Sequence, residues 1–464
     1  MFPKQVYIER RKKLKELMQD YYGILFFPGN SDVPFNYPAN IYPFRQDSNF
    51  LYFFGIDRPN IAAIIDLYTG EEIIFGTELT INDIIWMGKQ PSIKEQASQI
   101  GVDKTMDLVE LKEIINSAIK QKRPIHILPP YRGETKHWIE QLLGLDYDKS
   151  PFYASEPFIK AVVSLREIKD QYEIAEIERM IEVAYNMHTS AMKMAKPGVK
   201  EQQIAGTIQG ISLSHEGPVS FPVIVTVNGQ TLHNNYYGNT LISGQLLLVD
   251  AGAESINHYA SDITRTTPVG GKFSSRQKDI YEIVLEANQQ AIEAIKPDKP
   301  YKDVHLLAAK IIAQGLKDIG LMKGNVEDIV KEGAHALFFP HGLGHMLGLD
   351  VHDMEGLGED YVGYTEEIKR SEQFGLAFLR LAKPLIPGHV LTVEPGIYFI
   401  PDLIDLWKQK NKFKEFINYD KVEKFKDFGG IRIEDDVIVT KDKAQVLGKP
   451  IPKTIEEVEN LCLQ

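Results

Sequence analysis

Three histidines lie within twelve residues, from His341 to His352, in a chain that has twelve histidines in all. The glycines between His341, His345 and His352 allow close approach of the backbone, so a short segment can direct several imidazoles to one place. Imidazoles bind metal ions and transfer protons near neutral pH. Taken alone, the segment is a candidate metal or proton-handling site.

Four carboxylates stand in motifs that accompany this segment. They are Asp250 in Leu-Val-Asp-Ala-Gly, Asp262 in Ala-Ser-Asp-Ile-Thr, Glu394 in Thr-Val-Glu-Pro-Gly and Glu434 in Arg-Ile-Glu-Asp-Asp. Oxygen ligands with one imidazole suit Mn²⁺, Co²⁺ or Zn²⁺ better than a softer ion. Two such ions about 3.5–4 Å apart can share carboxylates and a water, whose pKa falls toward neutrality. The motifs together predict hydrolysis of a carbonyl or phosphoryl group.

The elements that must position these acids are short strands. Asp250 ends the apolar run 245–249 and Asp262 lies twelve residues later in a second strand-like run, so we expect a hairpin that directs both carboxylates to one place. Each acid alone is more simply a turn or cap residue, and only their joint occurrence with the histidines weakens that alternative.

The second pair of acids is placed by two further runs. Glu394 precedes Pro395, which stops its strand from continuing in a central ladder. The alternation in residues 430–439 predicts one strand with Arg432 and Glu434 on the same face, and the simpler alternative is an exposed ion pair worth little. The three acids 434–436 are costly unless cations offset them, which favours the metal site.

Length and pattern predict two domains of α/β (α+β) class. A chain of 464 residues exceeds the usual single core. Short β-like runs alternate with helical stretches over residues 1–164, as in an α/β domain. A long helical pattern then leads into residues 165–464, which carry every candidate ligand.

Composition excludes several classes of function. A formal net charge of −12 argues against general binding to nucleic acid or anionic membranes. The basic run from Arg10 to Lys15 is interpreted as the solvated face of a first amphipathic helix. The charged start of the chain and its short apolar runs predict neither a secretory signal nor a membrane span. Cys462 is the only cysteine, so cysteine-based zinc sites are excluded and a cytoplasmic location is expected.

The ordered motifs resemble those of the pita-bread metallopeptidases, which include methionine aminopeptidase, Xaa-Pro aminopeptidase and Xaa-Pro dipeptidase (prolidase). The resemblance covers nearly the whole chain. Residues 42–55, Tyr-Pro-Phe-Arg-Gln-Asp-Ser-Asn-Phe-Leu-Tyr-Phe-Phe-Gly, look like the N-terminal domain of the proline-specific members. The resemblance therefore implies an aminopeptidase P-type α/β domain, a C-terminal pita-bread catalytic domain, and Xaa-Pro peptides as substrates.

The resemblance also implies a role for each matching residue. Asp250 binds one metal ion, Asp262 and Glu434 bridge, and His345 with Glu394 completes the second site. His233, His341 and His352 contact substrate or stabilise the transition state, Arg432 orients the metal carboxylates, and Glu394 passes the proton to the departing proline nitrogen. The Asp250 to Asp262 spacing is one residue longer than is typical of the family, which we interpret as a larger hairpin turn.

Two proline-specific activities fit the motifs. The long segment 401–428 and Arg380, which matches an arginine that holds the free carboxylate of a dipeptide, look like prolidase. Residues 45–53 look more like Xaa-Pro aminopeptidase, which is the preferred prediction, with dipeptides also cleaved. The expected cofactors are two divalent ions, Mn²⁺ first, and the expected assembly is a homodimer or homotetramer. A non-catalytic pita-bread binding module and a dimetal phosphoesterase are the alternatives.

Overall fold

The computed structural model describes residues 1–215 and 217–464, which divide into two compact units. The N-terminal unit comprises residues 1–166 and 354–361, and the C-terminal unit comprises residues 167–353 and 362–464. Across the described residues, no helix is both long enough and apolar enough to cross a bilayer.

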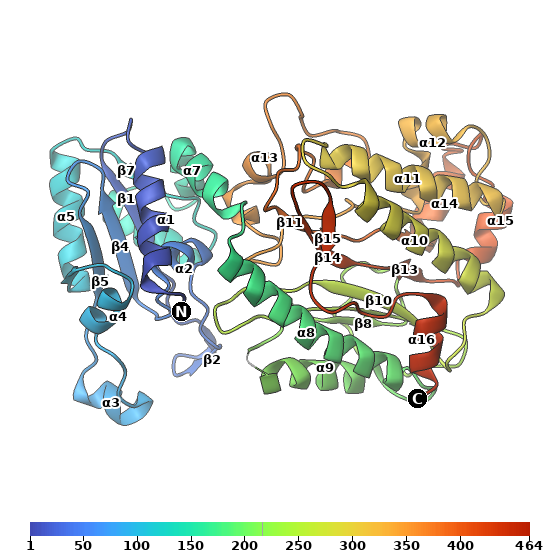
Figure 1. Ribbon diagram of the computed structural model, residues 1–464, viewed down its shortest axis with the longest axis horizontal. Coiled ribbons are helices and arrows are strands. Elements are labelled where there is room, and N and C mark those ends of the chain that lie inside the picture. The colour runs from blue at the N-terminus through green and yellow to red at the C-terminus, as the bar shows by residue number, and fades with distance from the viewer. Residues whose placement is uncertain (216) are drawn as a thin grey trace. The chain divides into compact units, whose positions relative to one another are not determined.

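A five-stranded mixed sheet with strand order β6-β5-β4-β1-β7 forms the N-terminal unit (Figure 1). Its strands are β1 (Ile24–Pro28), β4 (Ile61–Asp66), β5 (Glu72–Gly76), β6 (Lys104–Met106) and β7 (Ile125–His126). One face packs against α5 (Leu108–Lys120) and α6 (Gly133–Leu143), which supply Leu111, Ile115 and Ile139. On the other face, the ring of Phe27 packs against Phe53 and Phe158. The alternation of short strands and helices predicted for this part of the sequence is confirmed.

The remaining elements of this unit surround the sheet. They are α1 (Lys4–Leu17), the β2–β3 hairpin (Pro34–Tyr37, Asn40–Ile41), α2 (Ser48–Phe54), α3 (Ile81–Met87), α4 (Ile93–Gln99) and α7 (Glu156–Arg166).

The basic face of α1 is not fully solvated, and the interpretation of Arg10 and Arg11 as solvated residues is wrong. Arg10 is 5% exposed and Arg11 is completely buried. The guanidinium of Arg11 donates to Oε2 of Glu72 at 2.7 Å and to two backbone carbonyls. An arginine stem packs like an apolar side chain, and β5 supplies the counter-charge that makes burial possible.

The C-terminal unit contains a three-stranded sheet, β10-β9-β8, that packs on two helices (Figure 1). The strands are β8 (Ile224–Thr226), β9 (Leu246–Ala251) and β10 (Ile263–Pro268), and the helices are α8 (Gln171–Met194) and α9 (Glu201–His215). Met187 and Ile208 of the helices share a core with Val225 and Val249 of the sheet. Asp170 caps α8 in a capping box with Glu173, which explains why the long predicted helix begins there.

Two smaller sheets complete the framework of this unit. One has the order β11-β14-β15, with β11 (Val390–Val393), β14 (Asp435–Val439) and β15 (Ala444–Val446), and the other pairs β12 (Gly396–Tyr398) with β13 (Gly430–Arg432). The other helices are α10 (Ser275–Ala294), α11 (Tyr301–Asp318), α12 (Val326–Glu332), α14 (Pro401–Gln409), α15 (Tyr419–Val422) and α16 (Ile455–Cys462), and a short α13 (Glu359–Val362) leads back into this unit.

The single strand predicted for residues 430–439 is wrong, because the chain forms two strands there. β13 pairs with β12, whereas β14 pairs with β11, and residues 433–434 lie between them. The amide of Ile433 donates to the carbonyl of Pro395 and that of Glu434 donates to the carbonyl of Thr264. These long-range bonds draw the chain out of one ladder, which local alternation does not reveal.

Candidate functional site

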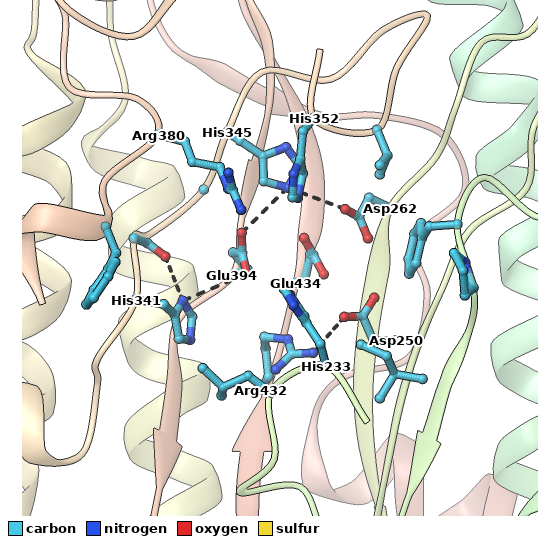
Figure 2. Close-up of a pocket in the computed structure, with 18 of the residues that line it drawn as sticks. His233, Asp250, Asp262, His341, His345, His352, Arg380, Glu394, Arg432 and Glu434 are labelled. Atoms are coloured by element: carbon cyan, nitrogen blue, oxygen red, sulfur yellow. Dashed lines mark hydrogen bonds and ion pairs between the residues drawn. The ribbon is translucent and has the colours of Figure 1, made fainter. Parts of the chain in front are cut away.

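A cavity of about 530 Å³ lies in the C-terminal unit, and all ten side chains singled out from the sequence line it. These are His233, Asp250, Asp262, His341, His345, His352, Arg380, Glu394, Arg432 and Glu434. Figure 2 shows the four carboxylates facing one another across its floor. The structure thus brings residues up to 201 positions apart, from His233 to Glu434, to one place.

The strands position the acids at their ends. β9 and β10 are antiparallel, as predicted, with Asp250 opposite Thr264, and Asp262 directly precedes β10. Glu394 directly follows β11, and Glu434 lies between β13 and β14. The acids therefore sit where ladders end, so that their side chains are held by flanking strands but not covered by them.

The imidazole of His345 is oriented as a ligand. Its Nδ1 lies 3.0 Å from the carbonyl of Met346, which can only accept, so the proton belongs on Nδ1 and Nε2 carries a lone pair. Nε2 faces Oδ2 of Asp262 at 3.4 Å and Oε1 of Glu394 at 3.7 Å. Three electron-rich atoms directed at one point at these distances fit a cation between them.

The acids are electrostatically crowded. Ligand atoms of Asp262, His345 and Glu434 all lie within 4.8 Å of one another, and all three side chains are buried. Burial raises the pKa of Asp262 and Glu434 well above the usual range, and nearby carboxylates add to the shift, chiefly Asp250 for Asp262 and Asp262 for Glu434. Burial likewise raises the pKa of Glu394, with His345 and Arg432 opposing the shift. A cation bound between these carboxylates would offset their mutual repulsion and favour their ionised forms.

Unpaired oxygens point to the same conclusion. Oδ1 of Asp250 and Oδ1 of Asp262 are buried with no hydrogen-bond partner among the described residues. Of the described residues lining the cavity, Arg380 and Arg432 are the cationic side chains, so four carboxylates face two formal positive charges. Buried carboxylates are stable only when paired or bound to metal, so the donor set fits divalent ions.

A network behind the acids holds Asp250 and His341 in place. Arg432 donates from Nη2 to Oδ2 of Asp250 at 2.6 Å, from Nε to Thr264 at 3.1 Å, and from Nη1 to the hydroxyl of Tyr398 at 2.9 Å. The same hydroxyl lies 2.8 Å from Nε2 of His341. Burial lowers the pKa of His341 to about 3, with the charge of Arg432 adding to the shift, so this imidazole is neutral and accepts from Tyr398.

Sequence reasoning missed Tyr398 and the residues that support Glu434. Tyr398 lies four residues beyond Glu394, and its position in a three-residue strand offers no local signal of a role. The hydroxyl of Thr264 donates to Oε2 of Glu434 at 2.7 Å. The sequence pattern of β10 identifies Thr264 as a strand residue but does not reveal its contact with Glu434. Both contacts arise from strand pairing and are visible only in three dimensions.

The three consecutive acids divide into different environments. Asp435 pairs with Arg265 and Lys453, and these cations hold its pKa well below the usual range although burial opposes them. Asp436 accepts the amide of Asp262 at 3.0 Å. The expectation that cations must offset these acids favoured a metal site, but for Asp435 the cations are Arg265 and Lys453, two side chains distant in the sequence.

The rim of the cavity carries the substrate-facing candidates. His233 is exposed on one side, and the ring of His352 lies 4.3 Å from that of His345 in an edge-on arrangement. Arg380 lies above Glu394 with its guanidinium directed toward the carboxylates (Figure 2). Apolar side chains, including Phe221, Leu232 and Phe378, line other parts of the same cavity.

Two family models match the chain. The model of metallopeptidase family M24 matches residues 175–441, and that of the aminopeptidase P N-terminal domain matches residues 7–127. A probable Xaa-Pro aminopeptidase of Uncinocarpus reesii is 32% identical over 464 residues, covering 97% of this chain and 92% of the relative. A human Xaa-Pro dipeptidase is 33% identical over 426 residues, covering 90% and 84%.

Solved structures show the same fold. Aminopeptidase P from E. coli with the inhibitor Pro-Leu has a TM-score of 0.81 at 28% identity, and the match covers 100% of this chain and 99% of that one. A zinc-substituted form of that enzyme in complex with product matches equally well. A cavity lined by convergent carboxylates and an imidazole on this fold defines a metal-dependent peptidase. The chain belongs to metallopeptidase family M24, which confirms the predicted family and fold class.

Proposed function

We propose that this protein is an Xaa-Pro aminopeptidase that uses two divalent metal ions to cleave the bond between an N-terminal residue and proline. The observation that carries the proposal is the convergence of His345, Asp262, Glu394 and Glu434: ligand atoms of Asp262, His345 and Glu434 lie within 4.8 Å of one another, and Nε2 of His345 faces both Asp262 and Glu394. Relatives named Xaa-Pro aminopeptidase and Xaa-Pro dipeptidase support the choice of substrate.

Five residues would hold the ions. Asp250 would bind one, Asp262 and Glu434 would bridge, and His345 with Glu394 would complete the second site. When bound, the ions supply Lewis acidity that lowers the pKa of water toward neutrality and polarises an amide carbonyl. Mn²⁺ is the ion we propose first, because four carboxylates and a single imidazole form a predominantly hard donor set.

The protein's own groups would bind substrate and move the proton. Glu394 lies at the cavity with its side chain 18% exposed, within reach of a bound peptide, and its carboxylate would pass a proton to the departing proline nitrogen. The neutral rings of His341 and His233, with His352, would orient the peptide and stabilise charge on its carbonyl oxygen. Arg432 would hold Asp250 in place.

Xaa-Pro dipeptidase activity is the second candidate, and a specific observation supports it. Arg380 lines the cavity, where its guanidinium can bind the free carboxylate of a dipeptide in a bidentate manner. The two activities are compatible if dipeptides and longer peptides both fit. A phosphoesterase is disfavoured because the cavity offers two arginines, one of which is engaged by Asp250. A non-catalytic module is disfavoured because all five ligand positions are filled.

Several finer properties complete the proposal. We propose that residues 1–164 and 165–464 form the two domains, that the protein is cytoplasmic, and that it is a homodimer or homotetramer. The single cysteine supports the location, and assembly is inferred by analogy alone. Size-exclusion chromatography with light scattering tests the assembly.

A substrate panel tests the function. Xaa-Pro dipeptides, Xaa-Pro-Xaa tripeptides and matched peptides with alanine in place of proline are incubated with Mn²⁺, with and without chelator. Chelator-sensitive cleavage of proline tripeptides, alone or with dipeptides, supports the aminopeptidase. Cleavage of dipeptides only indicates the dipeptidase, and cleavage of no proline peptide with any of Mn²⁺, Co²⁺ or Zn²⁺ refutes the proposal.

A further inference from the structure

An aromatic ring at the substrate cavity has no role in the chemistry above. Phe378 lines the cavity and is 56% exposed, more than any other phenylalanine or leucine among the lining residues. It lies two residues before Arg380. Ligand cavities are lined by apolar and aromatic side chains that bound ligands cover, so the position of this ring suits contact with substrate.

The backbone that carries Phe378 is fixed by its surroundings. We call residues 373–380 the rim segment. Gly375 has φ +92°, and a Cβ there would lie 2.8 Å from Cβ of Ala336, so only glycine fits. The carbonyl of Leu379 accepts from the hydroxyl of Tyr364 at 2.7 Å. The backbone is thus anchored on both sides of Phe378, and the orientation of its side chain depends on what the ring packs against.

The neighbour of that ring is Phe374, which connects the rim segment to α14. The rings of Phe374 and Phe378 meet edge to face with centroids 5.8 Å apart. The ring of Phe374 also lies edge-on to that of Trp407 in α14, with centroids 5.9 Å apart. Trp407 is only 4% exposed, so it provides a firm base for the more exposed Phe374. Edge-to-face pairs of this kind have a preferred geometry, so the position of one ring restricts the orientation of the next.

The ammonium group of Lys412 lies near three aromatic rings. Nζ of Lys412 lies 4.0 Å from the ring centroid of Trp407, 5.2 Å from that of Phe413 and 5.9 Å from that of Phe374. We call these four residues the aromatic clamp. Because Trp407 and Phe413 belong to residues 401–428 and Phe374 to the rim segment, the ammonium attracts both parts of the chain at once.

The turn that presents Lys412 is unusual in its backbone. Asn411 and Phe413, on either side of it, have φ of 48° and 51°, a region that residues with a side chain adopt at a cost. The amide of Lys412 donates to the carbonyl of Trp407 at 2.9 Å, and its carbonyl accepts from the hydroxyl of Tyr419. Such conformations persist where the surroundings fix them, often near functional sites. The backbone of this turn therefore fixes the position from which the ammonium of Lys412 reaches the rings.

We propose that Phe378 is a specificity-determining residue that contacts the peptide substrate, and that Lys412, with Trp407 and Phe374, positions its ring. The proposal rests on the Xaa-Pro peptidase function. It gives residues 401–428 a purpose, since they would support the rim segment that carries both Phe378 and Arg380. None of the clamp residues lines the cavity, so their influence on substrate would pass through Phe374 to Phe378.

Steady-state kinetics on Xaa-Pro peptides test the contact. Phe378→Ala is expected to raise KM about ten-fold, the loss from uncovering roughly half a phenylalanine side chain, with kcat unchanged within about two-fold. Lys412→Met keeps the aliphatic stem and removes the charge, and is expected to raise KM about five-fold. Lys412→Arg retains a cation over the rings and should restore KM. Lys449→Met is the matched control, because Nζ of Lys449 lies 3.5 Å from the ring centroid of Tyr185 and neither residue lines the cavity.

Hydrogen exchange tests the clamp without relying on activity. Peptides covering residues 373–381 should exchange about five-fold faster in Lys412→Met than in wild type, while α8 is unchanged and Lys412→Arg and Lys449→Met behave as wild type. Unchanged exchange over residues 373–381 overturns the clamp, whatever the activity. Faster exchange with unaltered KM overturns its link to substrate, as does unaltered KM in Phe378→Ala. If the wild type cleaves no Xaa-Pro peptide, the proposed function fails, and the exchange measurement still decides the clamp.

Discussion

Replacing Glu434 by glutamine is expected to shift stability in opposite directions in the metal-free and metal-loaded protein. Ligand atoms of Asp262 and Glu434 lie within 4.8 Å of one another. At an effective dielectric constant of about 20, two unit charges at that separation repel by roughly 3.5 kcal/mol. Proton uptake relieves part of this repulsion, because burial and Asp262 raise the pKa of Glu434 well above its usual range. We therefore expect metal-free Glu434→Gln to be more stable than wild type by about 1–2 kcal/mol at pH 8.

In the presence of metal, we expect Glu434→Gln to be less stable than wild type. A bound ion stabilises the wild type by about 2.7 kcal/mol when the free ion is at 100 times its dissociation constant. The variant lacks one anionic ligand, so it binds metal weakly and loses most of this gain. The hydroxyl of Thr264, which donates to Oε2 of Glu434, can still donate to the amide oxygen of glutamine, so the packing is preserved.

The assay is urea unfolding at pH 8, followed by tryptophan fluorescence, with EDTA or with MnCl₂. Glu327→Gln serves as the control, because that carboxylate is 69% exposed and pairs with Lys310 at the surface. It should leave both curves unchanged within about 0.5 kcal/mol. A Glu434→Gln protein that is less stable than wild type in EDTA, or that gains as much from Mn²⁺, refutes the assignment of repulsion to this cluster.

Three further predictions concern single residues. Glu394→Ala should lower kcat by about 10² or more, as expected for loss of a proton-transfer group and ligand, while circular dichroism shows an intact fold; near-normal turnover contradicts its role. Arg380→Ala should raise KM for Xaa-Pro dipeptides about ten-fold more than for tripeptides, and an equal effect on both removes Arg380 from carboxylate recognition. Burial, with Lys383 and Lys169, lowers the pKa of His389 to about 2. The folded state therefore binds fewer protons than the unfolded chain below about pH 6.5. From there, His389 should lower the free energy of unfolding of the metal-loaded protein by about 1.4 kcal/mol for each pH unit of acidification. A His389→Gln variant with the same pH dependence in urea unfolding would show that the ring does not contribute.

Much of the candidate site could be predicted because its residues occur in local motifs. Asp250 and Asp262 end or precede strands whose apolar runs are visible in the sequence, and the hairpin between them is short. The three histidines from His341 to His352 are separated by glycines that make their convergence plausible. Patterns within about twenty residues carried these predictions, since periodicity and turn chemistry operate at that range.

Predictions failed where distant parts of the chain decide the environment. Arg11 is buried because Glu72 on β5 lies beside it, although its neighbours in sequence suggest a solvated face. Asp435 is neutralised by Arg265 and Lys453 instead of by metal. Burial sets the energetic value of a charge, and burial depends on contacts between segments that no local pattern specifies.

The sequence by itself determined the class of chemistry, because its motifs combine carboxylates with an imidazole, and that donor set suits divalent metal ions. It also determined the family and most of the strands and helices that carry the ligands. Only the tertiary structure decided that Tyr398 links His341 to Arg432, and that Lys412 connects residues 401–428 to the ring of Phe378 through Phe374. Both depend on side-chain geometry at a few ångströms between segments far apart in the chain, and hydrogen bonds and ring contacts act only at that range.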